Sequence, residues 1–207
     1  EKMETKITEI TPSRSKMLYQ HVARKVSWLQ ELLMADASSG KATAAMLRKN
    51  IGKAPGADPT VWDATLGDLP VGLQGWDDSP SFAESATHLA LTLYAVHQQS
   101  RIKPMHVVGR GLGNAVRGFI GAGQGENFES SPTIRRFNAL VTSDSIDEMA
   151  WHLRSLVTQL RGAGISLDYA QLAVDLYSFN FPEARDGIRL KWGRQLYAWQ
   201  KGSKFED

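Results

Sequence analysis

Apolar residues recur at helical spacing along most of the chain. Residues 14–34 place apolar side chains at steps of three and four, which predicts an amphipathic helix of several turns: Leu18, Val22, Val26, Leu29 and Leu33. A second long helix is predicted over 144–164 by a similar stripe: Met149, Leu153, Leu156, Val157 and Leu160. We find no convincing alternating strand and no internal repeat. The pattern therefore predicts an all-α fold.

Less regular patterns predict the remaining helices, over residues 40–50, 60–70, 79–99, 113–123, 130–143, 167–179 and 182–202. Ser79 followed by Pro80 is typical of a helix start, so we expect the 79–99 helix to begin there. Apolar residues occupy most of its circumference, which predicts a central buried helix. Ser143 or Asp144 is expected to cap the second long helix.

Two segments interrupt the helical pattern and suggest how the chain is divided. Residues 52–80 are acidic and rich in glycine and proline, which predicts a long loop. The glycine-rich and polar segment near 123–132 is a second interruption and a candidate boundary between two units. We expect an N-terminal helical unit over 1–123 and a C-terminal bundle of about four helices over 132–207.

The composition is that of an ordinary soluble globular protein, with 42% apolar and 22% charged residues among 207. The absence of cysteine excludes disulfides, thiolate zinc sites and a cysteine nucleophile. The N-terminal residues form no apolar signal region, and no run approaches ~18 apolar residues. We therefore expect a cytoplasmic protein that does not contact membranes.

The formal net charge of +2 conceals a strong segregation of charge. Residues 58–84 hold six acids and neither lysine nor arginine. Four stretches hold lysine or arginine but no acid: 11–30, 37–57, 85–125 and 187–205. Segregation of this kind permits a basic surface at nearly neutral total charge. The alternative is that each stretch is a solvated helix face, neutralised in space by acids from elsewhere.

The stretch 94–119 combines four basic residues with a glycine-rich run. It contains no dinucleotide-binding motif, because the third glycine would fall at Asn114 or Val116 and a helix precedes the run instead of a strand. Two interpretations stay open. The glycines either let the backbone at a helix start approach a phosphate, or they form a turn between helices.

Candidate catalytic and metal-binding residues form no recognisable motif. The five histidines include no HExxH pair, the serines include no GxSxG elbow, and the carboxylate pairs fall at turns and helix starts. We therefore expect no enzymatic activity, no cofactor and no metal. His97 is expected to be a hydrogen-bonded group at a helix end. The tryptophans are predicted to lie mostly in the core, including Trp151 and Trp192.

Arginine carries the most informative pattern. Three basic pairs are spaced seven residues apart, which in a helix places each pair on one side, about 10 Å apart: Lys41/Arg48, Arg110/Arg117 and Arg154/Arg161. A helix that begins after Arg110 would weaken the second pair. Arg154 and Arg161 are displaced from the predicted buried stripe and should face outward. Arg135 and Arg136 begin a helix, where positive charge is unfavourable unless an anion is bound. Guanidinium groups suit phosphate oxygens, so this pattern favours sequence-independent nucleic-acid binding.

Several segments occur in the order that is found in one known family. They are LYAVHQQS, MHVVGRGLGNAVR, TIRRFNALVTSDSIDEMAWHLRSLVTQLR, GISLDYAQLAVDLYSF and IRLKWGRQLY. In these segments the chain resembles the CasB family, the small subunit of the type I-E CRISPR Cascade surveillance complex. The resemblance covers roughly residues 15–200 and is loosest over the first 60.

The resemblance implies an all-helical, non-catalytic protein that binds nucleic acid without sequence preference. It also implies partners: guide RNA and target DNA, the large and backbone subunits of Cascade, and a second copy of the chain. In that setting the protein would stabilise the R-loop, including the displaced strand, while the guide RNA reads the sequence.

The family's basic positions can be carried onto matching segments of this chain. The best matches are Arg48, Arg117, Arg135, Arg136 and Arg154. Weaker candidates, chosen from the charge pattern, are Arg24, Lys49, Lys103, Arg110, Arg161 and Arg194. Two alternatives remain. One is a helical adaptor whose basic face docks acidic proteins, and the other is a hydrolase, which would need a carboxylate or histidine cluster that we do not find.

Overall fold

A computed structural model describes residues 13–122 and 131–197 of the chain. These residues form α-helices, two short 3-10 helices and one isolated bridge between His106 and Leu167, and no strand occurs among them. The predicted all-α class is confirmed. In chain order the elements are α1 (Arg14–Met34), α2 (Ser38–Lys49), η1 (Pro59–Val61), α3 (Trp62–Thr65), η2 (Val71–Leu73), α4 (Phe82–Gln98), α5 (Leu112–Ala122), α6 (Pro132–Thr142), α7 (Ile146–Ala163), α8 (Tyr169–Phe179) and α9 (Pro182–Tyr197).

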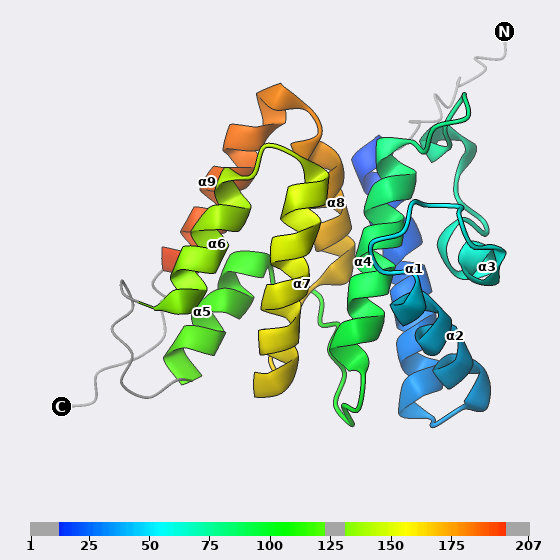
Figure 1. The fold of residues 1–207 in the computed structure, drawn as a ribbon, viewed down its shortest axis with the longest axis horizontal. Coiled ribbons are helices and arrows are strands. Elements are labelled where there is room, and N and C mark those ends of the chain that lie inside the picture. The colour runs from blue at the N-terminus through cyan, green and yellow to red at the C-terminus, as the bar shows by residue number, and fades with distance from the viewer. Residues whose placement is uncertain (1–12, 123–130, 198–207) are drawn as a thin grey trace, which may run out of the picture.

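The helices pack in two rows. The helices α6, α7, α4 and α2 follow one another across the side that faces the viewer in Figure 1, and each contacts the next. We call these four helices the front row. Behind them α9, α8 and α1 form a second row, and α5 packs against α9, α7 and α6. Within the second row α8 packs extensively on α1, and it joins the two rows by packing on α4.

The centre of the structure is α4, as its apolar circumference predicts. Every residue from Ala86 to Ala95 is buried, and the helix is covered by α1, α2, α7 and α8. His97 near its end is fully buried, with Nδ1 2.8 Å from the Tyr169 hydroxyl of α8. Burial lowers the pKa of His97 to about 4, so the ring stays neutral. The expectation of a hydrogen-bonded helix-end histidine is confirmed.

Helix bounds agree closely with the sequence pattern, but two predicted caps are wrong. The start of α4 is capped by Ser81, whose Oγ accepts from Glu84 N at 3.0 Å while Glu84 Oε2 accepts from Ser81 N at 2.7 Å. This capping box satisfies two backbone donors, which the serine at position 79 cannot do. Ser145 caps α7 by accepting from Glu148 N at 3.2 Å, so neither Ser143 nor Asp144 has that role.

The division of the chain into two units stays a prediction. Residues 123–130, where the boundary was expected, lie outside the described residues, as do 1–12 and 198–207. The segment between α2 and α4, expected as a loop with one short helix, contains η1, α3 and η2. None of the described helices combines the length and the apolar character that crossing a bilayer requires.

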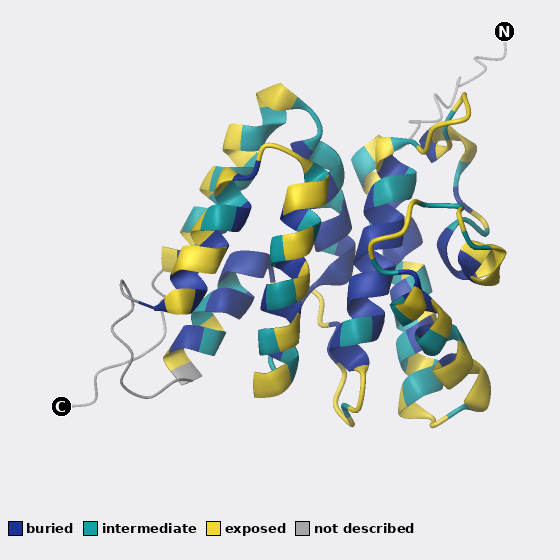
Figure 2. Ribbon diagram, in the orientation of Figure 1, coloured by how far each residue is buried: buried dark blue, intermediate teal, exposed yellow. Residues whose placement is uncertain are grey.

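The expectation that the tryptophans lie mostly in the core is wrong. Of the five that the structure describes, only Trp192 is fully buried. The exposed fractions of the others range from 41% for Trp28 to 88% for Trp76. Exposed positions lie along the outer sides of the helices in Figure 2. Trp151 is 71% exposed because the buried side of α7 is already filled by the predicted stripe of Met149, Leu153, Leu156, Val157 and Leu160.

The glycine-rich run serves helix packing. A Cβ on Gly113 would lie 2.7 Å from Gln195 Cβ and would clash with the backbone carbonyl of Trp192, so glycine lets α5 approach α9. The first turn of α5 is also occupied, since Gly113 N donates to Gln195 Oε1 at 3.1 Å. Of the two interpretations left open, the structure therefore favours packing between helices over approach of the backbone to a phosphate.

Replacing Gly113 with alanine should destabilise the protein, because the added methyl group forces α9 away from α5. We expect a loss of about 1–3 kcal/mol in the free energy of unfolding. The matched control is Gly118→Ala in the same helix, where the new Cβ would lie 3.9 Å from its nearest neighbour, Ile165. That change should be neutral or should stabilise by up to about 1 kcal/mol. Urea denaturation measures both, and equal effects would contradict the packing role.

Candidate nucleic-acid interface

The front row contains very few acidic residues. Its four helices hold Glu84, Asp147 and Glu148, each in the first turn of α4 or α7, while α2 and α6 hold none. Six of the predicted basic residues belong to this row: Arg48 and Lys49 on α2, Arg135 and Arg136 on α6, and Arg154 and Arg161 on α7. The structure thus brings α2 and α4, which belong to the basic stretches 37–57 and 85–125, together with α6 and α7 on one side of the molecule.

The most specific feature of the front row is a basic cleft of about 600 Å³ at the last turns of α4. Its charged lining residues are Lys41 and Arg48 of α2, Arg101 from the turn after α4, and one acid, Asp36, which is paired with Lys41. Arg48 is half-buried, and its side chain makes no hydrogen bond or ion pair among the described residues. Its pKa is lowered, first by burial and then by the positive charge of Arg161. The cleft therefore presents positive charge that the described residues leave unneutralised.

Two arginines fix the positions of the helices beside this cleft. Arg161 Nη1 donates to Gln99 Oε1 at 3.0 Å and to the Val96 carbonyl at 3.4 Å, at the end of α4. In return, Arg101 Nη2 donates to the Gly162 carbonyl at 3.0 Å, near the end of α7. Each arginine thus satisfies carbonyl groups at the C-terminal end of the other segment's helix, where positive charge is favourable. Their charges remain close to Arg48.

The arginines of α6 and α7 extend the basic surface away from the cleft. Arg154 is exposed, as expected, whereas Arg161 is half-buried against α4 instead of facing outward. Arg135 and Arg136 are both exposed on α6. The first turn of α6 lies against the second half of α7, where the Thr133 hydroxyl is 3.1 Å from Gln159 Oε1. This contact places the first turns of α6, which carry Arg135 and Arg136, beside the second half of α7.

Five further predicted residues lie outside this group, and several have internal partners. Arg24 on α1 donates to the Asp68 carbonyl at 3.4 Å, Arg117 on α5 to the Leu196 carbonyl at 3.0 Å, and Arg110 to Ser166 Oγ at 3.1 Å. Lys103 is exposed in the turn after α4, and Arg194 is exposed on α9. Their role in binding remains a prediction.

Sequence reasoning left out two residues of the basic cleft, Lys41 and Arg101. Lys41 is paired with Asp36 at 2.7 Å. Its spacing of seven residues from Arg48 was a usable signal, since both side chains line the cleft. Arg101 belongs to the acid-free stretch 94–119. It lines the cleft because α2 packs beside the end of α4, a pairing that the sequence pattern does not reveal.

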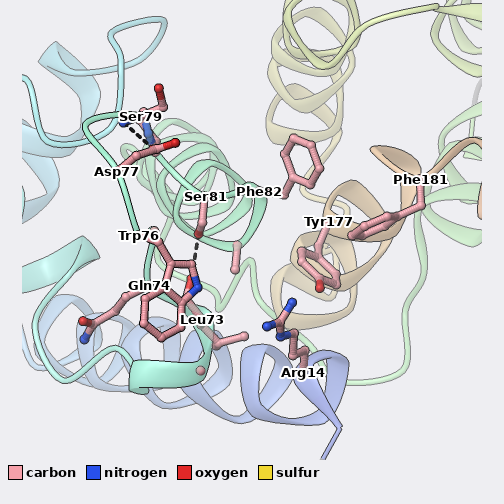
Figure 3. Close-up of a pocket in the computed structure, with 14 residues that line it drawn as sticks. Arg14, Leu73, Gln74, Trp76, Asp77, Ser79, Ser81, Phe82, Tyr177 and Phe181 are labelled. Carbon is pink, nitrogen blue, oxygen red and sulfur yellow. Dashed lines mark hydrogen bonds between the residues drawn. The ribbon is translucent and has the colours of Figure 1, made fainter.

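A second hollow, of about 390 Å³, lies at the opposite end of α4 (Figure 3). Trp76, Phe82, Tyr177 and Phe181 line it, with Phe82 and Phe181 in edge-to-face contact at 5.6 Å. Arg14 and Asp77 are its charged lining residues, and an adjoining hollow shares Asp77 and adds two further acids, so this end of the molecule is less suited to a polyanion than the basic cleft. Among the residues described, no group of His, Asp and Glu side chains is arranged to hold a metal ion.

The chain is similar to one family and to several solved structures. The model of the family described as CRISPR-associated protein Cse2 matches residues 43–197. The structure of CasB from Thermobifida fusca is 35% identical, with a TM-score of 0.75, over 88% of this chain and 98% of that one. No curated protein matches the chain.

Two further structures share the fold. A Cse2-family CRISPR-associated protein from Thermus thermophilus is 26% identical, with a TM-score of 0.63, over 86% of this chain and 98% of that one. A chain of a CRISPR RNA-guided surveillance complex is 20% identical, with a TM-score of 0.64, over 86% of this chain and 92% of the other. At that level of identity the last match shows likeness of fold alone.

Removing the charge of Arg48 should cost less stability than removing that of its neighbour Lys49, and it should weaken the affinity for polyanions. Both residues lie in the last turn of α2, where positive charge is favourable, so each substitution by methionine loses that interaction. Arg48→Met also ends the repulsion with Arg161 and avoids burying a cation, so we expect its free energy of unfolding, measured in urea, to exceed that of Lys49→Met by roughly 0.5 kcal/mol at low salt. The difference should shrink as added salt screens the repulsion. Equal or lower stability of Arg48→Met would contradict the description of Arg48 as an unneutralised cation.

Proposed function

The chain belongs to the CRISPR-associated protein Cse2 family, and from this we propose that it is a non-catalytic, nucleic-acid-binding subunit of an RNA-guided surveillance complex. Its task would be to stabilise the R-loop, which consists of the duplex between guide RNA and target DNA together with the displaced DNA strand. The front row would be the surface that contacts nucleic acid.

The observation that carries this proposal is the placement of Arg48. A half-buried guanidinium beside a second guanidinium is unfavourable in the free chain, and burial and Arg161 both lower its pKa. A bound phosphate would remove this penalty, because an opposite charge favours the charged form and accepts the guanidinium's hydrogen bonds. The near absence of acids from the surrounding helices leaves a phosphate backbone without strong repulsion.

Binding of this kind reads the phosphate backbone and leaves the base sequence unread. Each arginine or lysine that neutralises a phosphate displaces counterions, and many such contacts together supply the affinity. This suits a subunit in a complex where guide RNA pairing selects the target. By holding phosphates of separated strands, the front row would slow their reannealing without performing any chemistry.

The same proposal assigns the protein partners to other surfaces. The large subunit, the backbone subunits and a second copy of the chain would contact regions outside the front row. The acidic segment 58–84 is unsuited to nucleic acid and so is available for protein contacts. The adaptor hypothesis differs on one point, because it assigns the basic surface itself to acidic proteins.

Salt-dependent binding of nucleic acid by the full-length chain tests the proposal. Wild-type protein should bind labelled single- and double-stranded DNA and RNA without sequence preference, with affinity that falls steeply as salt rises. Reversing two α6 charges, in Arg135→Glu/Arg136→Glu, should weaken binding to every sequence. The salt slope, which is the slope of log K against log salt concentration, should become shallower by roughly 1 for each phosphate that is no longer neutralised. Fluorescence anisotropy at several salt concentrations measures both quantities.

The matched control makes an equal charge change on α1, in the second row. Arg14 and Lys16 are exposed in the first turn of α1, where glutamate is compatible with the helix dipole. Arg14→Glu/Lys16→Glu should therefore keep the wild-type salt slope. Equal reductions of affinity in the two variants would mean that only net charge matters, and no salt-dependent binding of wild type would favour the adaptor hypothesis.

A further inference from the structure

The front row presents one large aromatic side chain that packing does not explain. Trp151 on α7 is 71% exposed, although a tryptophan normally buries most of its surface. Its ring makes an edge-to-face contact with His152, with centroids 4.9 Å apart and ring planes at 77°. A contact of this geometry covers at most one face of the indole, so at least one face remains open to a stacking partner.

From Trp151 to the end of α7 the exposed charges are basic, whereas Asp147 and Glu148 lie one turn before the indole. Trp151, Arg154, Thr158 and Arg161 follow one another at steps of three and four, so they form one stripe along the outer side of α7. No acid occurs between Met149 and Leu167. Arg154 lies one helical turn from the indole, and the stripe ends at the basic cleft. Trp151 thus belongs to the surface that the proposed function assigns to phosphates.

A comparison with Trp76 shows what distinguishes Trp151. Trp76 is 88% exposed, but Asp77 and Asp78 follow it directly and line the hollows beside it, where Arg14 is the one arginine among the lining residues. Trp151 also has carboxylates nearby, on the turn before it, but Arg154 and Arg161 follow it along the same stripe. A strand that runs from Trp151 toward the end of α7 therefore meets successive guanidinium groups and leaves the carboxylates behind it.

We propose that Trp151 is a stacking platform for an unpaired base of a single strand, whose phosphates run past Arg154 toward Arg161 and Arg48. This inference rests on the proposed function and adds to it the strand type that α7 contacts. In a duplex both faces of each base are already stacked, so a surface indole gains a partner only where the strand is single. Stacking on an aromatic ring accepts any base, which preserves binding without sequence preference.

The experiment compares two labelled 15-mers that carry the same phosphates, oligo-dT and a fully abasic strand. Trp151→Ala in the full-length chain should weaken oligo-dT binding by about five- to a hundredfold and leave the abasic strand unaffected. The salt slope should not change, because every phosphate that wild type neutralises is still neutralised. Trp151→Phe should recover most of the affinity, since a phenyl ring also stacks. Trp76→Ala is the matched control and should bind both strands as wild type does.

The possible failures are distinct. If Trp151→Ala binds oligo-dT as wild type does, or binds both strands more weakly by the same factor, the stacking role is wrong while the proposed function stands. If wild type binds neither strand at low salt, the proposed function fails and this inference fails with it. Arg154→Gln separates stacking from phosphate binding, because it should weaken both strands alike and flatten the salt slope by about 0.7.

Discussion

The burial of α4 is the constraint on which the rest of the structure depends. A helix that is apolar on nearly every side cannot face water, so four other helices have to cover it. Two of these, α2 and α7, lie beside it in the front row, and their outer sides are free to carry charge. The sequences of these helices put arginine there, and the two acids that they contain, Asp147 and Glu148, lie in the first turn of α7. The requirement to bury one helix thus determines where the cations of two others meet.

Some arginines of the front row are hydrogen-bonded within the protein, and others are available to bind an anion. Arg161 and Arg101 are engaged in closing the adjacent ends of α7 and α4, and they fix the shape of the basic cleft. Arg48 has no such use, and its burial beside Arg161 makes it the residue that gains most from an anion. Arg154 is an exposed charge one turn from Trp151. Arg101 and Arg161 therefore fix the helix ends, and Arg48 and Arg154 remain available to bind an anion.

The periodic apolar pattern was sufficient to predict the helices, and it gave the bounds of α1 and the buried stripe of α7 without error. Cap positions were wrong by one or two residues because competing serines lie within a few positions of each helix start. The tryptophans were misplaced because an apolar residue type does not determine which side of a helix it occupies. The grouping of Arg48 with Arg161 could not be predicted, since it arises only when α2 and α7 pack on the same helix.

The proposed function requires that the front row lie against nucleic acid when the protein is part of a surveillance complex. Photocross-linking tests this directly, with a benzoyl-phenylalanine side chain at position 158, between Arg154 and Arg161, or at position 20 on the exposed side of α1. In the assembled complex bound to target DNA, position 158 is expected to form adducts with a DNA or RNA strand, and position 20 is expected to form none. Adducts from position 158 to protein subunits alone would contradict it.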